Sequence, residues 1–389
     1  MVSYRQLCAR IVVQIDTQQL PSAVMTQTSV REPVRAMPRF LAGMTREFTV
    51  EGRQMFAAEL KRFAGCVGDG NRDPRLAKIS ARVCAPVGVS VHGRRGVGVT
   101  TVAEALGANG VAVRDDGPGE LAVLVTVEVL KPEDLTLADA LRARGADVLV
   151  VLNKADLVGR APDGSLAAAH HRAQQLRERT GLPVVPMVGL LARATLSPHL
   201  VEALRLLATT PADLTSTEAF LADPHPVAQA TRTELLTTLD RFGIVHACRE
   251  LSRDPNADAA VLSAALRRLG ETDRVLAALD ALAAPRRYRR IERALTELQA
   301  VGGESVGRFL AADTTVVAVM DAALEVMRAA GVVVPSRAAC GRDAHLRRAR
   351  FWWRYCRGPV GALHGRCAAA IARGSLRLAG LDTEEAARR

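Results

Sequence analysis

The stretch that decides the fold is 87–101, which reads VGVSVHGRRGVGVTT. It begins with a short apolar, β-branched run over 87–91, which predicts a buried strand. A glycine-rich loop follows, and the helical period begins at residue 100, so the chain turns directly from strand to helix. Such turns are typical of parallel α/β sheets, in which ligands bind at the carboxyl ends of the strands.

The same alternation of strands and helices continues from 81 to about 210. The expected strands are 110–114, 121–129, 147–152 and 183–188, and the expected helices are 100–107, 134–144, 165–179 and 197–208. From 216 to 330 the sequence has the helical period alone, in segments 226–253, 257–269, 271–283, 286–301 and 304–330. We therefore predict four regions: 1–80 of uncertain structure, an α/β domain with a mainly parallel sheet over 81–210, an all-helical bundle over 211–335, and a basic, aromatic tail over 336–389.

Composition excludes several classes of protein. Hydrophobic residues make up 49% of the chain and charged residues 24%, which indicates a folded protein rather than a disordered one. The seven cysteines are scattered and form no CxxC pair, which favours reduced thiols and neither a disulfide framework nor a zinc site. Apolar runs fall short of the roughly 20 residues that cross a bilayer. We therefore expect a cytoplasmic protein.

The loop after the first strand has the spacing GxxxxGK[ST] of a phosphate-binding P-loop, with one departure. Backbone N–H groups of such a loop and the following helix N-terminus surround a phosphate, and a hydroxyl at Thr100 would ligate Mg²⁺. Val99 stands where the lysine should be. The candidate phosphate-binding residues are Gly93, Arg94, Arg95, Gly96, Gly98, Thr100 and Thr101. The alternative is a glycine-rich turn that binds nothing.

A second motif, Asn153-Lys154-Ala155-Asp156, directly follows the expected buried strand 147–152. It matches NKxD, in which the aspartate accepts hydrogen bonds from guanine N1 and N2. The lysine stem lies over the base, and the asparagine ties this loop to the P-loop. Lys154 is one of only four lysines in the chain. The alternative is a polar strand–helix turn with an ordinary cap.

Two weaker motifs complete the set. Asp116 and Gly119 have the DxxG spacing of a switch that senses a γ-phosphate, although Asp-Gly-Pro-Gly is also an ordinary turn. Gly189 ends an expected strand at the point where GTPases present a backbone N–H to guanine O6. The serine of that motif is absent here.

The order of these motifs on an α/β frame resembles a translation-factor-class (Era-like) GTPase domain over about 85–210. The helical region is similar in pattern to small bacterial dynamin-like GTPases, through Leu239-Asp240-Arg241-Phe242-Gly243, 262–278 and 286–301. The resemblance implies binding of GTP and GDP with Mg²⁺. Val99 lacks the catalytic charge, and only 14 residues separate Thr101 from Asp116, which is too short for a complete switch I. Hydrolysis should therefore be slow or absent.

Two other interpretations stay open. Residues 94–101 (RRGVGVTT) resemble the KGGVGKTT loop of ParA/MinD ATPases with both lysines lost, although NKxD is foreign to that group. The chain is alternatively a scaffold that has kept the fold and binds no nucleotide.

The tail is a candidate for binding an acidic partner. Region 336–389 has twelve arginines and four acidic residues, so it carries +8 of the net charge of +11. Four of the chain's 13 aromatic residues lie within 351–355. We expect this tail to bind the anionic inner face of a membrane, or to dock its aromatic side chains on the helical domain. Nucleic acid is a less favoured partner, because no fold for it is visible. The sequence leaves open whether the chain forms homo- or hetero-oligomers.

Overall fold

The computed structural model describes residues 51–66, 73–114, 117, 119–159, 164–334 and 341–388, which all belong to one compact unit, 46–389. The predicted switch residue Asp116 lies outside the described residues. In the part of the chain that is described, no helix has the length and apolar character needed to cross a membrane.

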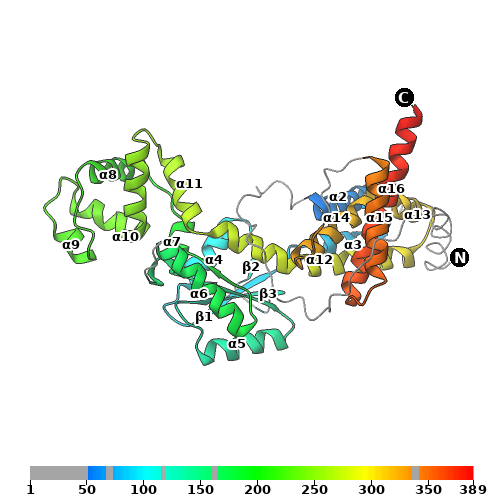
Figure 1. Ribbon diagram of the computed structural model, residues 1–389, viewed down its shortest axis with the longest axis horizontal. Helices are drawn as coiled ribbons and strands as arrows, with labels where there is room; N and C mark the ends of the chain where they lie inside the picture. Colours follow the sequence, from blue (N-terminus) through cyan, green and yellow to red (C-terminus); the bar gives the residue numbers. More distant parts are fainter. Residues whose placement is uncertain are drawn as a thin grey trace, which may run out of the picture. The chain divides into compact units, whose positions relative to one another are not determined.

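The described part contains a five-stranded parallel sheet, which confirms the expected α/β region (Figure 1). Its strands are β1 (Val89–Gly93), β2 (Val113–Arg114), β3 (Leu121–Thr126), β4 (Asp147–Leu152) and β5 (Val184–Pro186). The spatial order is β2-β1-β3-β4-β5. All residues of β3 and all but Asp147 of β4 are buried, as expected for apolar strands that are covered on both faces.

Alternate residues of the central strands pack into two separate cores. One face, with Val123 and Val125 of β3, packs against α4 (Val99–Ala108) and the first half of α12 (Thr272–Val301). The other face, with Leu124, packs against α5 (Pro132–Ala143) and α6 (Ser165–Thr180). The period of two along a strand therefore produces a three-layer arrangement.

The strand order places a topological switch point beside β1. The chain passes from β1 to β2 on one side and then to β3 on the other side of β1. In open α/β sheets ligands bind in the crevice outside the carboxyl ends of the strands at such a point. The loop after β1 is therefore in the position where a ligand is expected.

The helical part forms two hydrophobic cores rather than the single bundle expected over 211–335. The first core contains α8 (Pro198–Thr209), α9 (Thr217–Ala222), α10 (Gln229–Arg253) and α11 (Ala259–Leu269). The second contains α2 (Glu51–Cys66), α3 (Pro74–Cys84), the second half of α12, α13 (Glu304–Ala311), α14 (Asp313–Ala329), α15 (Arg342–Cys356) and α16 (Ala362–Arg388). Helices from both ends of the chain thus share a core.

α12 joins the sheet to the second helical core. The sequence predicts two helices, 271–283 and 286–301, because a proline removes one helical hydrogen bond. The structure has one helix of 30 residues that continues through Pro285. Val275 before the proline packs on the sheet, and Tyr288 after it packs in the helical core. Burial on both sides offsets the lost hydrogen bond.

The basic tail is part of the second helical core. Trp352 is fully buried there with Phe56 of α2, and Gly374 of α16 approaches Met320 of α14 so closely that a Cβ would lie 2.5 Å from the Met320 Cβ. Of the two interpretations of the aromatic cluster, docking on the helical domain is the one that holds for Trp352. Phe351, whose ring contacts Trp352 edge-on with 5.2 Å between the ring centroids, is 47% exposed.

Candidate nucleotide-binding site

The glycine-rich loop after β1 depends on glycine at two positions. Gly96 and Gly98 have φ values of +86° and +89°, which side chains rarely allow. A Cβ at Gly98 would also lie 2.4 Å from Asn153 Nδ2. The loop therefore passes close to the second motif, and α4 begins directly after Gly98.

Asn153 connects three loops at the carboxyl edge of the sheet. Its Nδ2 donates to the carbonyl oxygen of Val97 over 2.8 Å, and its Oδ1 accepts from the N–H of Gly189 over 3.0 Å. The side chain is 3% exposed. The expectation that this asparagine ties its loop to the glycine-rich loop is confirmed. The N–H of Gly189, expected to face a base, is instead donated to Asn153.

Lys154 lies along the glycine-rich loop. Its Nζ donates to the carbonyl oxygen of Gly96 over 3.2 Å, and its own backbone is left-handed, with φ +54°. The next residue, Ala155, is fully buried and donates its N–H to the carbonyl oxygen of Met187. Side-chain and backbone bonds thus hold this loop against both of its neighbours.

Asp156 is the second residue of the short 3₁₀ turn Ala155–Leu157, and its side chain is half-buried. Burial raises the pKa of its carboxyl group, and the negative charge of Asp240 raises it further. A backbone hydrogen bond and the charge of Lys154 act in the opposite direction. Asp156 therefore takes up a proton more readily than an exposed aspartate does.

Helices of the first helical core pack against the turn α7 (Gly189–Ala192). A Cβ at Gly243 of α10 would lie 2.7 Å from Leu191 Cδ2, and the carbonyl oxygen of Gly270 accepts the N–H of Val188. Asp240 interrupts α10 with φ +53° and ψ +175°. Non-glycine residues with such backbone angles gather at functional sites. The sequence did not predict that Asp240 lies near Asp156, because Asp240 was noted only as part of the pattern 239–243.

The start of α4 differs from a charged phosphate loop. A Cβ at Gly93 would lie 2.9 Å from Val99 Cγ2, so Val99 packs over the end of β1. Thr100 is exposed and Thr101 half-buried. In the described ranges no three His, Cys, Asp or Glu residues gather as a metal-binding group. Thr100 is the single Mg²⁺ ligand that the sequence predicts, and its side chain lies on the surface.

The structure explains the glycine at position 119 without the DxxG motif. A Cβ there would lie 2.5 Å from the backbone nitrogen of Ser90 and 2.5 Å from the carbonyl oxygen of Leu121. Any side chain would separate the segment before β3 from β1. Close packing of the backbone therefore accounts for glycine at this position.

The two loop arginines have different surroundings. Arg94 Nε donates to Asp134 Oδ1 over 3.0 Å, and the Asp134 side chain is 1% exposed. Arg95 is exposed. Asp134 was not identified from the sequence. Its position three residues after Lys131, at the start of a helix, is the signal that could have indicated it. Of the two arginines expected to serve the loop, Arg94 is paired with a buried carboxylate and Arg95 is exposed.

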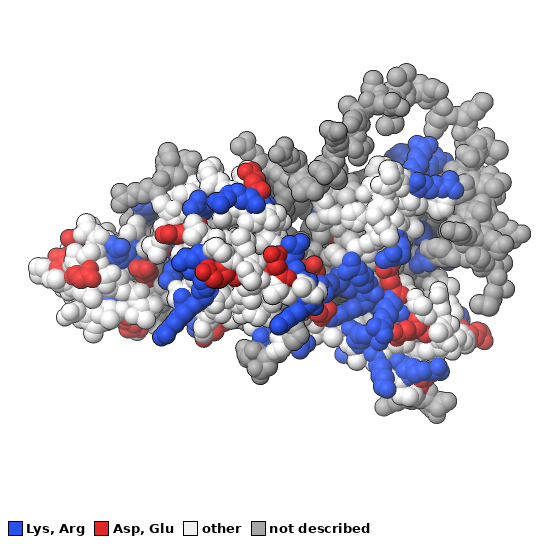
Figure 2. All heavy atoms as spheres, turned by 90° about the horizontal axis from the view of Figure 1, so that it is seen from below, with Lys and Arg blue, Asp and Glu red and all other residues white. Residues whose placement is uncertain are grey.

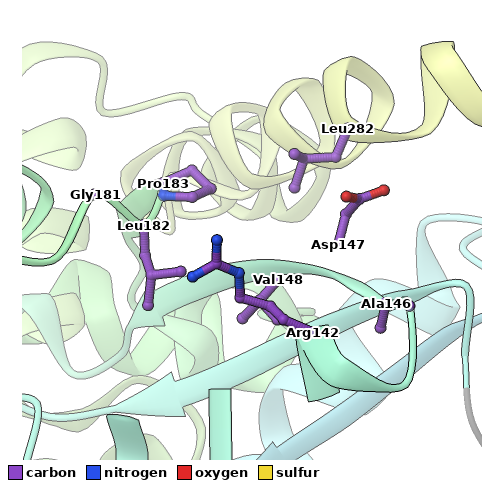
Figure 3. A pocket seen from close by; sticks show the side chains of 9 residues that line it. Arg142, Ala146, Asp147, Val148, Gly181, Leu182, Pro183 and Leu282 are labelled. Carbon is purple, nitrogen blue, oxygen red and sulfur yellow. The ribbon is translucent and has the colours of Figure 1, made fainter. Parts of the chain in front are cut away.

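A pocket of about 330 Å³ lies at the opposite edge of the sheet, where β4 and β5 begin (Figure 3). Arg142 extends its guanidinium group toward Leu182 and Pro183. The other charged lining residue, Asp147, is paired with Arg286 of α12 over 2.7 Å. None of the sequence-predicted site residues lines this pocket.

Comparison of the chain with protein-family models and with curated proteins found no match.

Proposed function

We propose that the chain binds guanine nucleotides at the carboxyl edge of the sheet, with little or no hydrolysis. The observation that carries the proposal is the contact of Asn153 with both Val97 and Gly189, which brings the NKxD loop against the glycine-rich loop. Lys154 contacts the same loop at Gly96. In this arrangement a single nucleotide would place its base beside Asp156 and its phosphates beside the loop after β1.

Guanine is the base that Asp156 would select. An ionised carboxylate accepts hydrogen bonds from guanine N1–H and N2–H, whereas adenine presents no such pair of donors. The phosphate side supports binding more than turnover, because Val99 supplies no charge to the phosphates. Phosphoryl transfer depends on positioned positive charge. Mg²⁺, where bound through Thr100, would supply part of that charge.

The deciding experiment is a titration of the purified protein with fluorescent GDP, GTP and ATP, with and without Mg²⁺. We expect a guanine preference that Asp156→Ala abolishes, since two charge-assisted hydrogen bonds amount to roughly 3 kcal/mol or more, about a hundredfold in affinity. Equal binding of GDP and ADP would favour the ParA/MinD-type interpretation. Binding of neither nucleotide would favour the scaffold. Rapid GTP turnover would contradict the second half of the proposal.

We also propose that α15 binds an anionic membrane surface. Its exposed residues Arg347, Arg350 and Arg354 surround Phe351, and in the described part of the chain none of the three pairs with a carboxylate. The arginines of α12 at 286, 287, 290 and 293 are each paired with an acid. Figure 2 shows one face of the molecule, on which Lys and Arg side chains lie among Asp and Glu side chains. Each unpaired arginine contributes about 1 kcal/mol near an anionic bilayer.

Because Trp352 belongs to the core, the membrane proposal is tested by surface variants rather than by removing the tail. Full-length protein should co-sediment with vesicles of phosphatidylserine and phosphatidylcholine, and Arg350→Glu/Arg354→Glu should abolish this. The matched control is Arg249→Glu/Arg253→Glu, which has the same spacing and charge change on exposed residues of α10. Equal loss in both variants, or no binding by the wild type, would contradict the proposal.

A further inference from the structure

Two side chains of opposite charge, Arg94 and Asp134, meet at the switch point of the sheet. Arg94 follows β1, and Asp134 lies in the first turn of α5, the helix that follows β3. Arg94 Nε donates to Asp134 Oδ1 over 3.0 Å. Since β1 and β3 are parallel neighbours, the pair spans the place where such sheets bind their ligands.

Both oxygens of the Asp134 carboxylate have a partner. Oδ1 accepts from Arg94, and Oδ2 accepts from the N–H of Lys131 over 2.9 Å. Among the described residues, Arg94 is the cation with which this 1% exposed carboxylate forms an ion pair. A buried carboxylate that loses its cation is strongly destabilising. The pair therefore holds the Arg94 guanidinium in one orientation.

The remaining donors of Arg94 are available to a ligand. Its side chain is 32% exposed, and within the described ranges its two η nitrogens form no hydrogen bond with the protein. A guanidinium has five N–H donors in one plane, so Nε can bind a carboxylate while the η nitrogens bind a phosphate. Lysine, a single ammonium, does not divide its donors in this way.

We propose that Arg94, oriented by Asp134, is the phosphate-binding residue that replaces the lysine missing at position 99. The inference rests on the nucleotide binding proposed above and adds which cation meets the phosphates. Arg95 has the same charge and is exposed, but no carboxylate among the described residues orients it. Ordering it on binding would lose side-chain entropy that the Asp134 contact has already removed from Arg94.

The test is a competition assay in which unlabelled GDP or guanosine displaces fluorescent GDP. Arg94→Ala should weaken GDP about tenfold or more, the range of a charge-assisted hydrogen bond, and leave guanosine unchanged because guanosine has no phosphate. Asp134→Asn should weaken GDP in the same selective way by a smaller factor. The controls are Arg95→Ala, a neighbouring charge that is not oriented, and Asp139→Asn on the exposed face of α5, where Asp139 faces Arg142.

Each outcome decides between the two proposals. One outcome is that the wild type prefers GDP over ADP and that Arg94→Ala binds GDP with wild-type affinity. In that case Arg94 is not the phosphate ligand, and the proposal of guanine binding stands. An equal loss of GDP and guanosine affinity would mean that the pair only supports the fold of the loop. A larger loss in Arg95→Ala would assign the role to Arg95. If the wild type binds neither ligand, the proposed function itself fails.

Discussion

The loop that follows β4 and the loop that follows β1 differ in how much of their expected chemistry is present. In the first, Asn153, Lys154 and Ala155 each make a contact that holds the loop in place. In the second, the glycines are present, yet Val99 packs on Gly93 where a charged side chain was expected. The NKxD loop thus keeps its contacts with its neighbours, whereas the glycine-rich loop keeps its glycines and lacks a charge at position 99.

The difference teaches that the shape of the glycine-rich loop and its charge have separate causes. Shape comes from glycine at 96 and 98 and from Asn153, which bonds to the backbone of Val97. The charge at position 99 would come from a side chain, and valine there packs on Gly93 without one. A chain can therefore have this loop shape without a lysine at position 99, and the four predictions that follow separate these contributions.

The largest expected effect is that of Asn153→Ala on stability. The substitution leaves the buried N–H of Gly189 and the carbonyl oxygen of Val97 without their partner, at roughly 1–3 kcal/mol for each group. Urea unfolding should show the loss. Asn109→Ala, which removes one partly exposed bond to Ala105, should lose no more than about 1 kcal/mol. Similar losses in the two variants would mean that Asn153 does not connect the loops.

Gly119→Ala separates packing from phosphate sensing. Because a Cβ would lie 2.5 Å from backbone atoms of Ser90 and Leu121, we expect a loss of about 1–3 kcal/mol in the free energy of unfolding. This loss should be the same with and without nucleotide. A variant of wild-type stability that no longer distinguishes GTP from GDP would instead support the switch interpretation.

Val99→Lys is a test of the altered phosphate side. The new ammonium should raise GDP affinity by about 1–3 kcal/mol, while the free energy of unfolding falls because the packing against Gly93 is disturbed. Val99→Met is the control, since it adds length without charge and should leave GDP affinity unchanged. An equal gain in both variants would exclude charge as the cause.

The smallest expected effect is a shift in pH dependence on the base side. Asp156 must be ionised to accept from guanine, and burial together with Asp240 raises its pKa. Guanine preference should therefore disappear at a higher pH than for an exposed aspartate. Asp240→Asn removes the neighbouring negative charge, lowers the pKa of Asp156 and should move this loss to lower pH. GDP and ADP titrations from neutral pH down to the pKa of an exposed aspartate, about 4, measure this shift. An unchanged pH profile in Asp240→Asn would mean that Asp240 does not act on Asp156.

The sequence by itself determined the local elements and the positions of the loops. The short apolar run 147–152 predicted the buried strand β4, and the helical period over 197–208 predicted α8, in which Leu200 and Leu204 are buried. Parallel strands place their carboxyl ends at one edge, so the motifs after β1 and β4 were expected to meet there. Asn153 meets Val97 for this reason.

Only the tertiary structure decided which distant segments share an environment. The pairing of Arg94 with Asp134, the effect of the Asp240 charge on Asp156, and the burial of Trp352 and Phe56 in one core all join residues of different elements. α12 continues through Pro285 because one half packs on the sheet and the other in the helical core. Local periodicity reports which face of an element is apolar, but it does not report which other element covers that face. That choice depends on how the whole chain buries its apolar surface, because the burial energy is non-directional and is summed over all the elements at once.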